Sequence, residues 1–439
     1  MKIAAAGPLR GEVGVPGDKS ISHRAVMLGS IAEGTSRVSG FLTGEDSVNT
    51  ARALSVMGVR IEGAEGGELT IHGVGLGGLN KPEGVLDLGN SGTSIRLLAG
   101  LLAGQGFGCT LTGDIYLQKR PMARIVKPLS MMGASLSGTG DRDYPPLTIN
   151  PAVQGRLKAI DYISPIASAQ VKSSILLAGL YADGTTSVTE PMKSRDHTER
   201  MLRFMGAEVG EDGLKASVTG GQRLLAREFE IPGDISSAAF FMVAAAIVPD
   251  SKIIIKNVGV NPTRTGIIDI LRLMNAAISV ENPREDGPEP IADIYVEYSD
   301  LCGIEIGGEL FLRAIDEFPI LCIAAAAAKG TTVIKDAAEL RVKESDRIAA
   351  MARELEKVGV PVREMPDGIE IEGGRPFRAA EVDSHGDHRV AMSMTIAGLI
   401  ADEGLKGGML VRDTECINTS FPGFVELLTK LGAEVAEVI

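Results

Sequence analysis

A small set of basic and acidic residues in this sequence could bind and transform an anionic substrate. The basic members are Lys19, Arg24, Arg120, Arg195, Lys343, Arg347 and Arg389. Ser20, Asn90, Gly92, Ser168, Gln170, Asp316 and Glu344 stand beside them or at corresponding points of the chain. Lysine and arginine bind phosphate and carboxylate oxygens, arginine often through two parallel hydrogen bonds. Aspartate and glutamate can move protons, so the set indicates acid–base chemistry on an anion.

Each of these residues also has an ordinary structural interpretation. Lys19 and Arg24 could be solvated charges on a helix, and residues 343–347 could be the exposed, mixed-charge start of another helix. Asp316 and Asp387 could be helix caps, and His388 could be purely structural. Their joint placement favours a site, because cations, caps and small polar residues replace one another at corresponding points of a repeat.

Composition limits the partners of such a site. The 439 residues carry 44 Lys and Arg against 57 Asp and Glu, a net charge of −13, which argues against nucleic acid or an anionic membrane as a partner. Aromatic residues are 4% of the chain and Trp is absent, so stacking on exposed rings is not expected. Any basic site must therefore be local.

The elements that position these residues follow a repeat. Six helical segments end in a turn with Gly or Asn, at residues 58, 133, 206, 275, 359 and 432, and an apolar strand follows each turn. In step with these turns, six apolar helices are predicted to begin at Asp18, Asn90, Ser168, Asp234, Asp316 and Asp387, all good capping residues. The capped helices are apolar almost all round and must be enclosed by other elements.

Six units of about 70 residues are too many for one core. The repeat therefore predicts two similar α/β domains of three units each, with a boundary near Gly233 and helices enclosed by sheets. A helix N-terminus carries about half a positive charge, so six such ends facing one cleft would supply roughly +3. With the lysines and arginines, this predicts a strongly positive pocket for small polyanions.

At these residues the sequence resembles the 5-enolpyruvylshikimate-3-phosphate synthase family. The resemblance covers essentially the whole chain, and six motifs in order make it specific. They are PGDKSISHRAV at 16–26, LGNSGTSIRLL at 88–98, KRPMARIVKPL at 119–129, SAQVKSS at 168–174, RVKESDRI at 341–348 and GDHRVAMS at 386–393.

The resemblance implies a fold of two inside-out α/β barrels, each of three βαβαββ units, with the active site in the interdomain cleft. It also implies that the N-terminal strand joins the C-terminal domain. The expected domains are therefore residues 20–232, and residues 1–19 together with 233–439.

The implied reaction joins phosphoenolpyruvate to the 5-hydroxyl of shikimate 3-phosphate and releases phosphate, with no metal or other cofactor. By motif position, the catalytic residues are Asp316 as the base and Lys19 with Glu344 for proton handling. The implied phosphoenolpyruvate contacts are Lys19, Asn90, Gly92, Arg120, Gln170, Arg347 and Arg389. Those to shikimate 3-phosphate are Lys19, Ser20, Arg24, Ser168, Ala169, Gln170, Arg195, Asp316 and Lys343.

Three departures place the chain nearer the family's second class. Ala169 stands where some members have Ser, Leu97 where many have Pro, and Thr419-Ser420 where some have a Lys before Phe-Pro. Gly92 matches members that are sensitive to glyphosate, an inhibitor that competes with phosphoenolpyruvate, while Leu97 leaves the potency open.

Two alternatives remain from the sequence. The sister family that transfers enolpyruvyl to UDP-N-acetylglucosamine usually has a reactive Cys shortly before its Arg-Pro pair, whereas residues 114–119 here are DIYLQK. A non-catalytic anion receptor on the same scaffold would gain nothing from carboxylates such as Asp316 and Glu344 beside its ligand.

The remaining sequence features concern location. The four cysteines, Cys109, Cys302, Cys322 and Cys416, form no CxxC pair, so neither zinc nor a disulfide framework is expected. The apolar run near residue 1 is too short for a signal peptide, and no apolar stretch is long enough to span a bilayer. We expect a cytoplasmic protein, without a membrane partner, that acts as a monomer.

Overall fold

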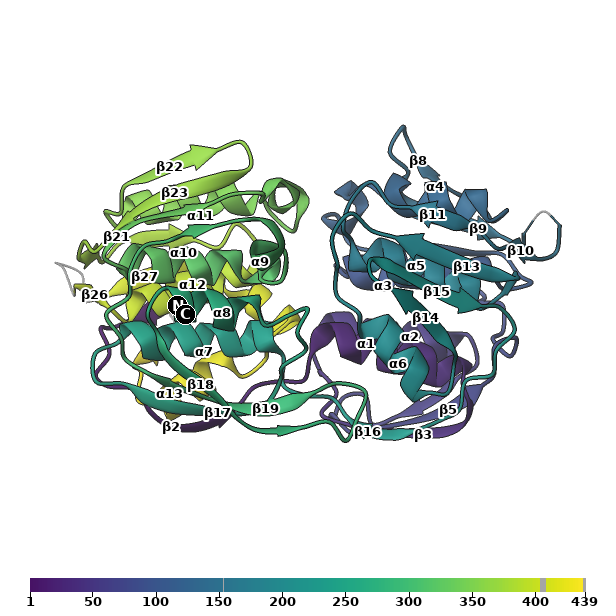
Figure 1. Ribbon diagram of the computed structural model, residues 1–439, viewed down its shortest axis with the longest axis horizontal. Coiled ribbons are helices and arrows are strands. Elements are labelled where there is room, and N and C mark those ends of the chain that lie inside the picture. The colour runs from purple at the N-terminus through teal and green to yellow at the C-terminus, as the bar shows by residue number, and fades with distance from the viewer. Residues whose placement is uncertain (153, 403–407, 437–439) are drawn as a thin grey trace. The chain divides into compact units, whose positions relative to one another are not determined.

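The computed structural model describes residues 1–152, 154–402 and 408–436, which form two compact units (Figure 1). The N-terminal unit comprises Gly17–Ile231 and Asp286–Glu289, and the C-terminal unit comprises Met1–Pro16, Pro232–Glu285 and Pro290–Ile439. The chain thus changes unit within a few residues of the expected limits, 19 and 232. No sequence pattern indicated that the short segment Asp286–Glu289 belongs to the N-terminal unit. Its Glu289 carboxylate is hydrogen-bonded to His197 Nδ1 of that unit at 2.7 Å.

The N-terminal unit contains three four-stranded sheets around its apolar helices, and all three sheets have the same order of parallel and antiparallel pairs. Their strand orders are β16-β3-β5-β4, β6-β7-β9-β8 and β11-β13-β15-β14. In each, the first pair is parallel and the other pairs are antiparallel. The strands are β3 (Glu33–Ser39), β4 (Arg60–Glu62), β5 (Leu69–Val74), β6 (Leu86–Asp87), β7 (Cys109–Thr112), β8 (Ser135–Thr139), β9 (Tyr144–Asn150), β11 (Asp161–Ile163), β13 (Thr185–Thr189), β14 (Val209–Asp212), β15 (Lys215–Thr219) and β16 (Glu228–Glu230).

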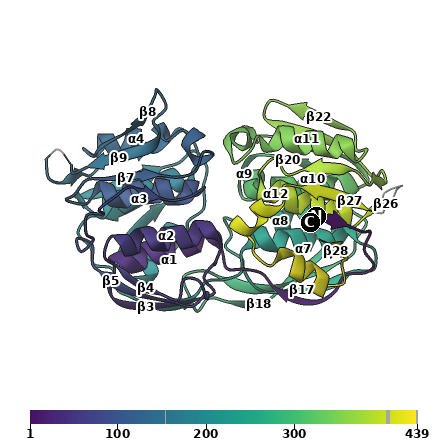
Figure 2. The same cartoon turned by 180° about the vertical axis from the view of Figure 1, so that it is seen from behind.

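The C-terminal unit repeats the same pattern in its own three sheets. Their orders are β2-β17-β19-β18, β20-β21-β23-β22 and β25-β27-β1-β28, again with one parallel pair followed by antiparallel ones. The strands are β1 (Lys2–Ile3), β2 (Arg10–Gly14), β17 (Lys252–Gly259), β18 (Ala277–Arg284), β19 (Ile291–Glu297), β20 (Glu305–Ile306), β21 (Gly330–Ile334), β22 (Val362–Met365), β23 (Gly368–Gly373), β25 (Glu381–Asp383), β27 (Met409–Arg412) and β28 (Val435–Ala436). Two short parallel pairs stand apart from these sheets, β10 (Leu157–Lys158) with β12 (Ala182–Asp183) and β24 (Phe377–Arg378) with β26 (Ala401–Asp402). Because β1 pairs with both β27 and β28, the two ends of the chain lie side by side, as Figure 2 shows.

Apolar helices form the interior of each unit. In the N-terminal unit they are α1 (Lys19–Ile31), α3 (Gly92–Ala103) and α5 (Ala169–Gly179), and in the C-terminal unit α7 (Ile235–Ile247), α10 (Phe318–Ala327) and α12 (His388–Gly398). Every residue of α7 is buried, as the sequence predicts for a helix without a polar face. The helices pack on one another inside the sheets, so the predicted inside-out α/β fold is confirmed.

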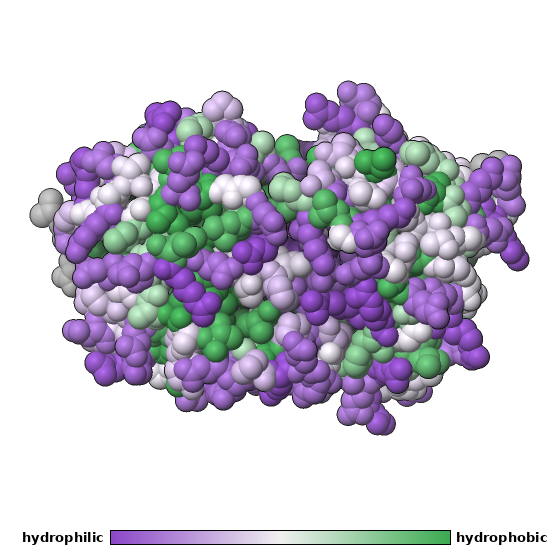
Figure 3. Space-filling view, viewed as in Figure 1, coloured by the Kyte–Doolittle hydropathy of each residue, from purple (hydrophilic) through white to green (hydrophobic). Residues whose placement is uncertain are grey.

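Amphipathic helices and short turns complete the units. The helices are α2 (Glu45–Val56), α4 (Ala123–Met131), α6 (His197–Phe204), α8 (Gly266–Leu273), α9 (Gly308–Leu312), α11 (Arg347–Lys357) and α13 (Phe424–Lys430), with 3-10 turns η1 (Leu117–Lys119), η2 (Ile315–Glu317), η3 (Ala338–Val342) and η5 (Glu415–Thr419). On the face seen in Figure 3, hydrophilic side chains are spread over both units between apolar ones. In the part of the chain that the structure describes, no helix is long and apolar enough to cross a membrane.

Most predicted helix boundaries are confirmed, and two are wrong. The turn residues 58, 133, 206, 275, 359 and 432 all have positive φ, between 74° and 106°. Asp18, Ser168, Asp234 and Asp387 cap their helices through their side chains. Asn90 does not cap α3, because Ser91 does so. Asp316 does not cap α10 either, since it lies inside turn η2 and the helix begins at Phe318.

Candidate functional site

The predicted site residues fall into two clusters, one in each unit. The N-terminal cluster consists of Lys19, Ser20, Arg24, Asn90, Gly92, Arg120, Ser168, Ala169, Gln170 and Arg195. The C-terminal cluster consists of Asp316, Lys343, Glu344, Arg347 and Arg389.

Lys19 is the first residue of α1 in the N-terminal cluster. Asp18 caps the helix by accepting from Ile21 N at 2.9 Å, which fixes the first turn. The Lys19 ammonium lies 2.5 Å from a carboxylate oxygen of Asp46 on α2, and both side chains are largely buried. An ammonium held in this way keeps one defined position at the helix start instead of sampling solvent.

Arg24 lies one turn further along α1 and is almost fully buried. Its guanidinium donates to the Ser20 carbonyl at 2.8 Å, to Thr198 Oγ1 at 2.6 Å and to Ser173 Oγ at 2.7 Å. Burial lowers its pKa to about 10, with Glu199 opposing and the neighbouring Arg195 adding to the decrease. Arg24 therefore stays charged at neutral pH, and it is close enough to Arg195 for the two guanidinium charges to interact.

The start of α3 brings Asn90, Gly92 and Arg120 together. Arg120 donates to the side-chain oxygen of Asn90, whose amide nitrogen donates to Asp114 at 2.9 Å. A Cβ on Gly92 would lie 3.0 Å from a guanidinium nitrogen of Arg120 and 3.0 Å from one of Arg96. The absence of a side chain at Gly92 therefore leaves room for two guanidinium groups beside the helix N-terminus.

Gln170 connects the start of α5 to that of α3. Its side chain accepts from Arg96 at 2.7 Å and donates to Thr93 Oγ1 at 3.0 Å. Ala169 is the first residue of α5, and Ser168 caps the helix by accepting from Val171 N. Since Arg24 also bonds Ser173 on α5, hydrogen bonds connect both α1 and α3 to α5 near its N-terminus. Within this unit, the predicted gathering of helix starts is present.

The C-terminal cluster surrounds the carboxylate of Asp316. Asp316 Oδ1 lies 3.4 Å from Lys343 Nζ and 3.5 Å from an Arg347 guanidinium nitrogen. Arg389, on the first turn of α12, donates to the Asp316 backbone carbonyl at 3.1 Å. The three cations thus hold the Asp316 turn from different sides.

Arg347 is fully buried and paired mainly with Asp387. Its Nε donates to Asp387 at 2.8 Å, and another guanidinium nitrogen donates to Glu344 at 2.8 Å. Burial would lower the pKa of the guanidinium, but the charges of Asp387, Glu344 and Asp316 outweigh burial and raise it. For Asp387, burial favours the neutral acid, yet the adjacent Arg347 keeps the pKa of the carboxyl below its usual value. Both groups are therefore charged at neutral pH.

Each cation of the C-terminal cluster has a carboxylate or carbonyl partner. Lys343 and Arg347 lie beside the carboxylates of Asp316, Glu344 and Asp387, and Arg389 donates to the Asp316 carbonyl. Buried cations need such partners, because an unpaired charge out of water is very costly.

Sequence reasoning missed the residues that hold these cations in place. Asp46 lies in a segment without a recognised motif, and Asp387 was considered only as a cap. Thr93 and Arg96 lie inside the 88–98 motif but were assigned no role with Gln170. A usable signal existed for Arg96, because an arginine on an apolar helix must find a polar partner.

The departures from the family pattern also have structural correlates. Leu97 is fully buried on α3, and the hydroxyl of Thr419 donates to the Cys416 carbonyl at 2.7 Å within its own turn. Cys109 is buried in β7, where burial raises the pKa of its thiol to about 11, so it is a poor nucleophile. Among the described residues, no group of three or more His, Cys, Asp or Glu side chains is arranged to hold a metal ion.

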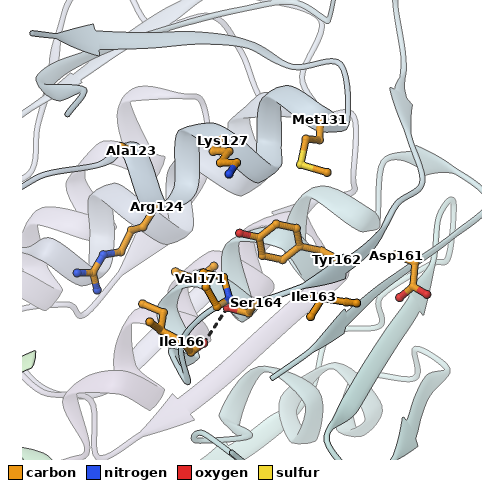
Figure 4. Close-up of a pocket in the computed structure, with 11 residues that line it drawn as sticks. Ala123, Arg124, Lys127, Met131, Asp161, Tyr162, Ile163, Ser164, Ile166 and Val171 are labelled. Carbon is orange, nitrogen blue, oxygen red and sulfur yellow. Dashed lines mark hydrogen bonds between the residues drawn. The ribbon is translucent and has the colours of Figure 1, made fainter. Parts of the chain in front are cut away.

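A separate groove lies between α4 and the segment that follows β11 in the N-terminal unit (Figure 4). It has a volume of about 650 Å³ and a mainly apolar lining. The lining residues are Ala123, Arg124, Lys127, Met131, Asp161, Tyr162, Ile163, Ser164, Pro165, Ile166 and Val171. None of the predicted site residues lines it, and its charged lining residues are Arg124, Lys127 and Asp161.

Comparison with known proteins gives one consistent result. Residues 3–428 match the family described as EPSP synthase (3-phosphoshikimate 1-carboxyvinyltransferase). The 3-phosphoshikimate 1-carboxyvinyltransferase of Geotalea uraniireducens is 57% identical over 432 residues, 98% of each chain. That of Geobacter sulfurreducens is 57% identical over 424 residues, 96% of this chain and 97% of the relative. A solved structure of EPSP synthase from Acinetobacter baumannii superposes with a TM-score of 0.88 at 51% identity and covers 99% of both chains.

Proposed function

The chain belongs to the EPSP synthase family, and we propose that it transfers the enolpyruvyl group of phosphoenolpyruvate to the 5-hydroxyl of shikimate 3-phosphate and releases phosphate. The observation that supports this most directly is the C-terminal cluster. A carboxylate that can act as a base, Asp316, lies among Lys343, Arg347 and Arg389, with Glu344 bonded to Arg347. Asp387 already pairs with the buried Arg347, so an anion receptor would not also need the half-buried Asp316 and Glu344.

The proposed chemistry uses acid and base in sequence. Protonation of the vinyl CH2 of phosphoenolpyruvate makes its C2 electrophilic, and Glu344 with Lys19 supplies that proton. Asp316 accepts the proton of the 5-hydroxyl, whose oxygen bonds to C2. The resulting tetrahedral adduct loses phosphate and returns a methyl proton to Glu344 with Lys19, which restores the double bond as an enol ether.

The cations have proposed roles in binding. Arg120, Arg347 and Arg389 bind the phosphate and carboxylate of phosphoenolpyruvate. Asn90, Gly92 and Gln170 contact the same substrate, and Asn90 also accepts a hydrogen bond from Arg120. Arg24, Arg195 and Lys343 bind shikimate 3-phosphate together with Ser20, Ser168 and Ala169. Two unit charges 4 Å apart repel by about 4 kcal/mol at an effective dielectric of 20, so two anionic substrates require several counter-charges.

A direct test is phosphate release in the presence of both substrates. We expect the protein to release phosphate only when both are present, and Lys19→Ala or Asp316→Ala to abolish turnover while the protein stays folded. Lys335→Ala is a matched control, because Lys335 is an exposed lysine paired with Glu305 outside both clusters. Absence of phosphate release from the unmodified protein would refute the proposed function. A near-normal rate in either cluster variant would refute that residue's role alone.

We further propose that the enzyme is a cytoplasmic monomer. All residues assigned above come from one chain, and its four cysteines are free, which suits a reducing compartment. Light scattering coupled to size-exclusion chromatography should give the mass of one chain. A stable dimer would refute the monomer.

A further inference from the structure

Glu190 is a buried carboxylate placed between two loops of the N-terminal cluster. It follows β13, and its side chain is only 2% exposed. One oxygen accepts from the Ser168 backbone N–H at 2.8 Å. The other accepts from the Ser194 hydroxyl at 2.8 Å and, more weakly, from the Ser194 N–H at 3.4 Å. A single side chain thus ties the residue that caps α5 to the loop before α6.

Lys172 neutralises this carboxylate. Its ammonium is also buried and lies 2.9 Å from Glu190 and 2.9 Å from Glu199 on α6. Burial would lower the pKa of Lys172, but the two carboxylates outweigh it and raise that pKa, so the lysine stays charged. Burial raises the pKa of Glu199. The raised pKa favours the neutral form of Glu199, and the Lys172 ammonium then balances the charge of Glu190.

The segments held by Glu190 contain residues assigned above to shikimate 3-phosphate. Ser168, Ala169 and Gln170 form the start of α5, and Arg195 directly follows Ser194. Both oxygens of Glu190 are already occupied by protein donors. A substrate phosphate would be repelled by a carboxylate that touched it, so Glu190 acts on the substrate through its neighbours.

We propose that Glu190, neutralised by Lys172, is a positioning residue for shikimate 3-phosphate that sets the relative placement of Ser168 and Arg195. This inference rests on the proposed function. A buried ion cluster is weak evidence for stability, because well-packed apolar residues often replace one at little or no loss. Its use here is to hold two loops in the geometry that the substrate requires.

Glu190→Gln tests the proposal, because the amide keeps the shape and one acceptor oxygen. The amide nitrogen cannot accept from Ser194 and places a donor against the Lys172 ammonium. We expect the Kd of shikimate 3-phosphate, measured by calorimetry with that ligand alone, to rise about ten-fold, which corresponds to the loss of one charged hydrogen bond. The KM of phosphoenolpyruvate at saturating shikimate 3-phosphate should change less than two-fold.

Asp293→Asn in the C-terminal unit is the matched control. Asp293 is also a buried carboxylate that accepts from a lysine, Lys256, from an amide, Asn282, and from a backbone N–H at 3.0 Å, but it contacts no assigned residue. We expect this variant to lower the melting temperature and leave the Kd of shikimate 3-phosphate unchanged. An equal loss of affinity in both variants would show that general destabilisation is responsible and would overturn the proposal.

If Glu190→Gln alone does not fold, the double variant Glu190→Gln/Lys172→Gln is used instead. It removes the ammonium that would face the new amide NH2, so that two amides can hydrogen-bond to each other. The same rise in Kd is expected from it. An affinity within two-fold of the unmodified protein, in whichever variant folds, would overturn the positioning role. Phosphate release by the unmodified protein separates this failure from a failure of the proposed function.

Discussion

Asp387→Asn probes the contact that holds Arg347 in place. The carboxylate of Asp387 receives the Nε–H of Arg347 at 2.8 Å and the Arg389 backbone N–H at 2.9 Å. Asparagine has the same shape and is an equally good helix cap, so the cap of α12 should survive. The substitution therefore removes the charge opposite a fully buried guanidinium and, when the amide oxygen stays at the cap, turns a donor toward the Arg347 Nε–H.

The magnitude follows from the geometry. At 2.8 Å and an effective dielectric of 20, the attraction between unit charges is about 6 kcal/mol. Part of it is offset, because the neutral amide no longer has to be desolvated as an ion, and Glu344 and Asp316 still face the guanidinium. Breaking a buried pair typically costs about 3–5 kcal/mol, and we take about 3 kcal/mol here. For a unit of 150–250 residues, that lowers the melting temperature by about 6–12 °C.

Thermal unfolding followed by circular dichroism between pH 7 and pH 4 checks this reasoning. The pKa of Asp387 is depressed in the folded state, so its stabilisation is complete above the unfolded value of about 3.9 and is lost as pH falls through the lower, folded value. The difference in melting temperature between the unmodified protein and Asp387→Asn should thus be largest at pH 7 and nearly as large at pH 5. Asp346→Asn is the control, because Asp346 caps α11 but is 38% exposed, and its loss should be under 1 kcal/mol. Equal melting temperatures for the Asp387 variant and the unmodified protein at pH 7 would refute the reasoning.

Three further predictions follow from the clusters. Gly92→Ala should raise the KM of phosphoenolpyruvate several-fold with little change in melting temperature, since the new Cβ meets Arg120 and Arg96 at 3.0 Å; steady-state kinetics checks this, and an unchanged KM contradicts it. Asp316→Asn should lower kcat by about 100-fold or more, as loss of a general base does, without unfolding the protein; a kcat within ten-fold of normal contradicts the base assignment. Thiol alkylation at pH 8 should label the exposed Cys302 and leave activity intact, because burial raises the pKa of Cys109 to about 11; rapid inactivation that substrate prevents would favour a catalytic thiol.

The parts of the fold that were predictable depend on local chemistry. The capping of α1 by Asp18 and the positive φ of Gly58 are each determined within a few residues, and the sequence shows both. Asn90 was wrongly expected to cap α3, because Ser91 beside it is an equally good cap and Asn90 is recruited by Arg120, 30 residues away. Asp316 was wrongly expected to cap α10 because a 3-10 turn precedes that helix.

The sequence indicated candidate site residues but not the side chains that pair with them. Motif positions indicated Lys19 and Arg347, yet nothing in the local sequence shows that Asp46 and Asp387 are their partners, because these contacts join different elements. Lys172 is an instructive miss. A lysine inside the apolar stretch of α5 requires a buried counter-charge, so its position alone implied Glu190 or a residue like it.

The pairing of cations with carboxylates changes how anion binding by this protein should be understood. In the C-terminal cluster each cation contacts a carboxylate or a backbone carbonyl, so its side chains are fixed as well as charged. Asp387 fixes Arg347 from one side and accepts the Arg389 backbone N–H at the start of α12, while the Arg389 guanidinium donates to the Asp316 carbonyl. Donors fixed before the substrate arrives need no reorganisation when charge develops during the reaction. The carboxylates that reduce the net charge are therefore the groups that make the remaining hydrogen-bond donors effective.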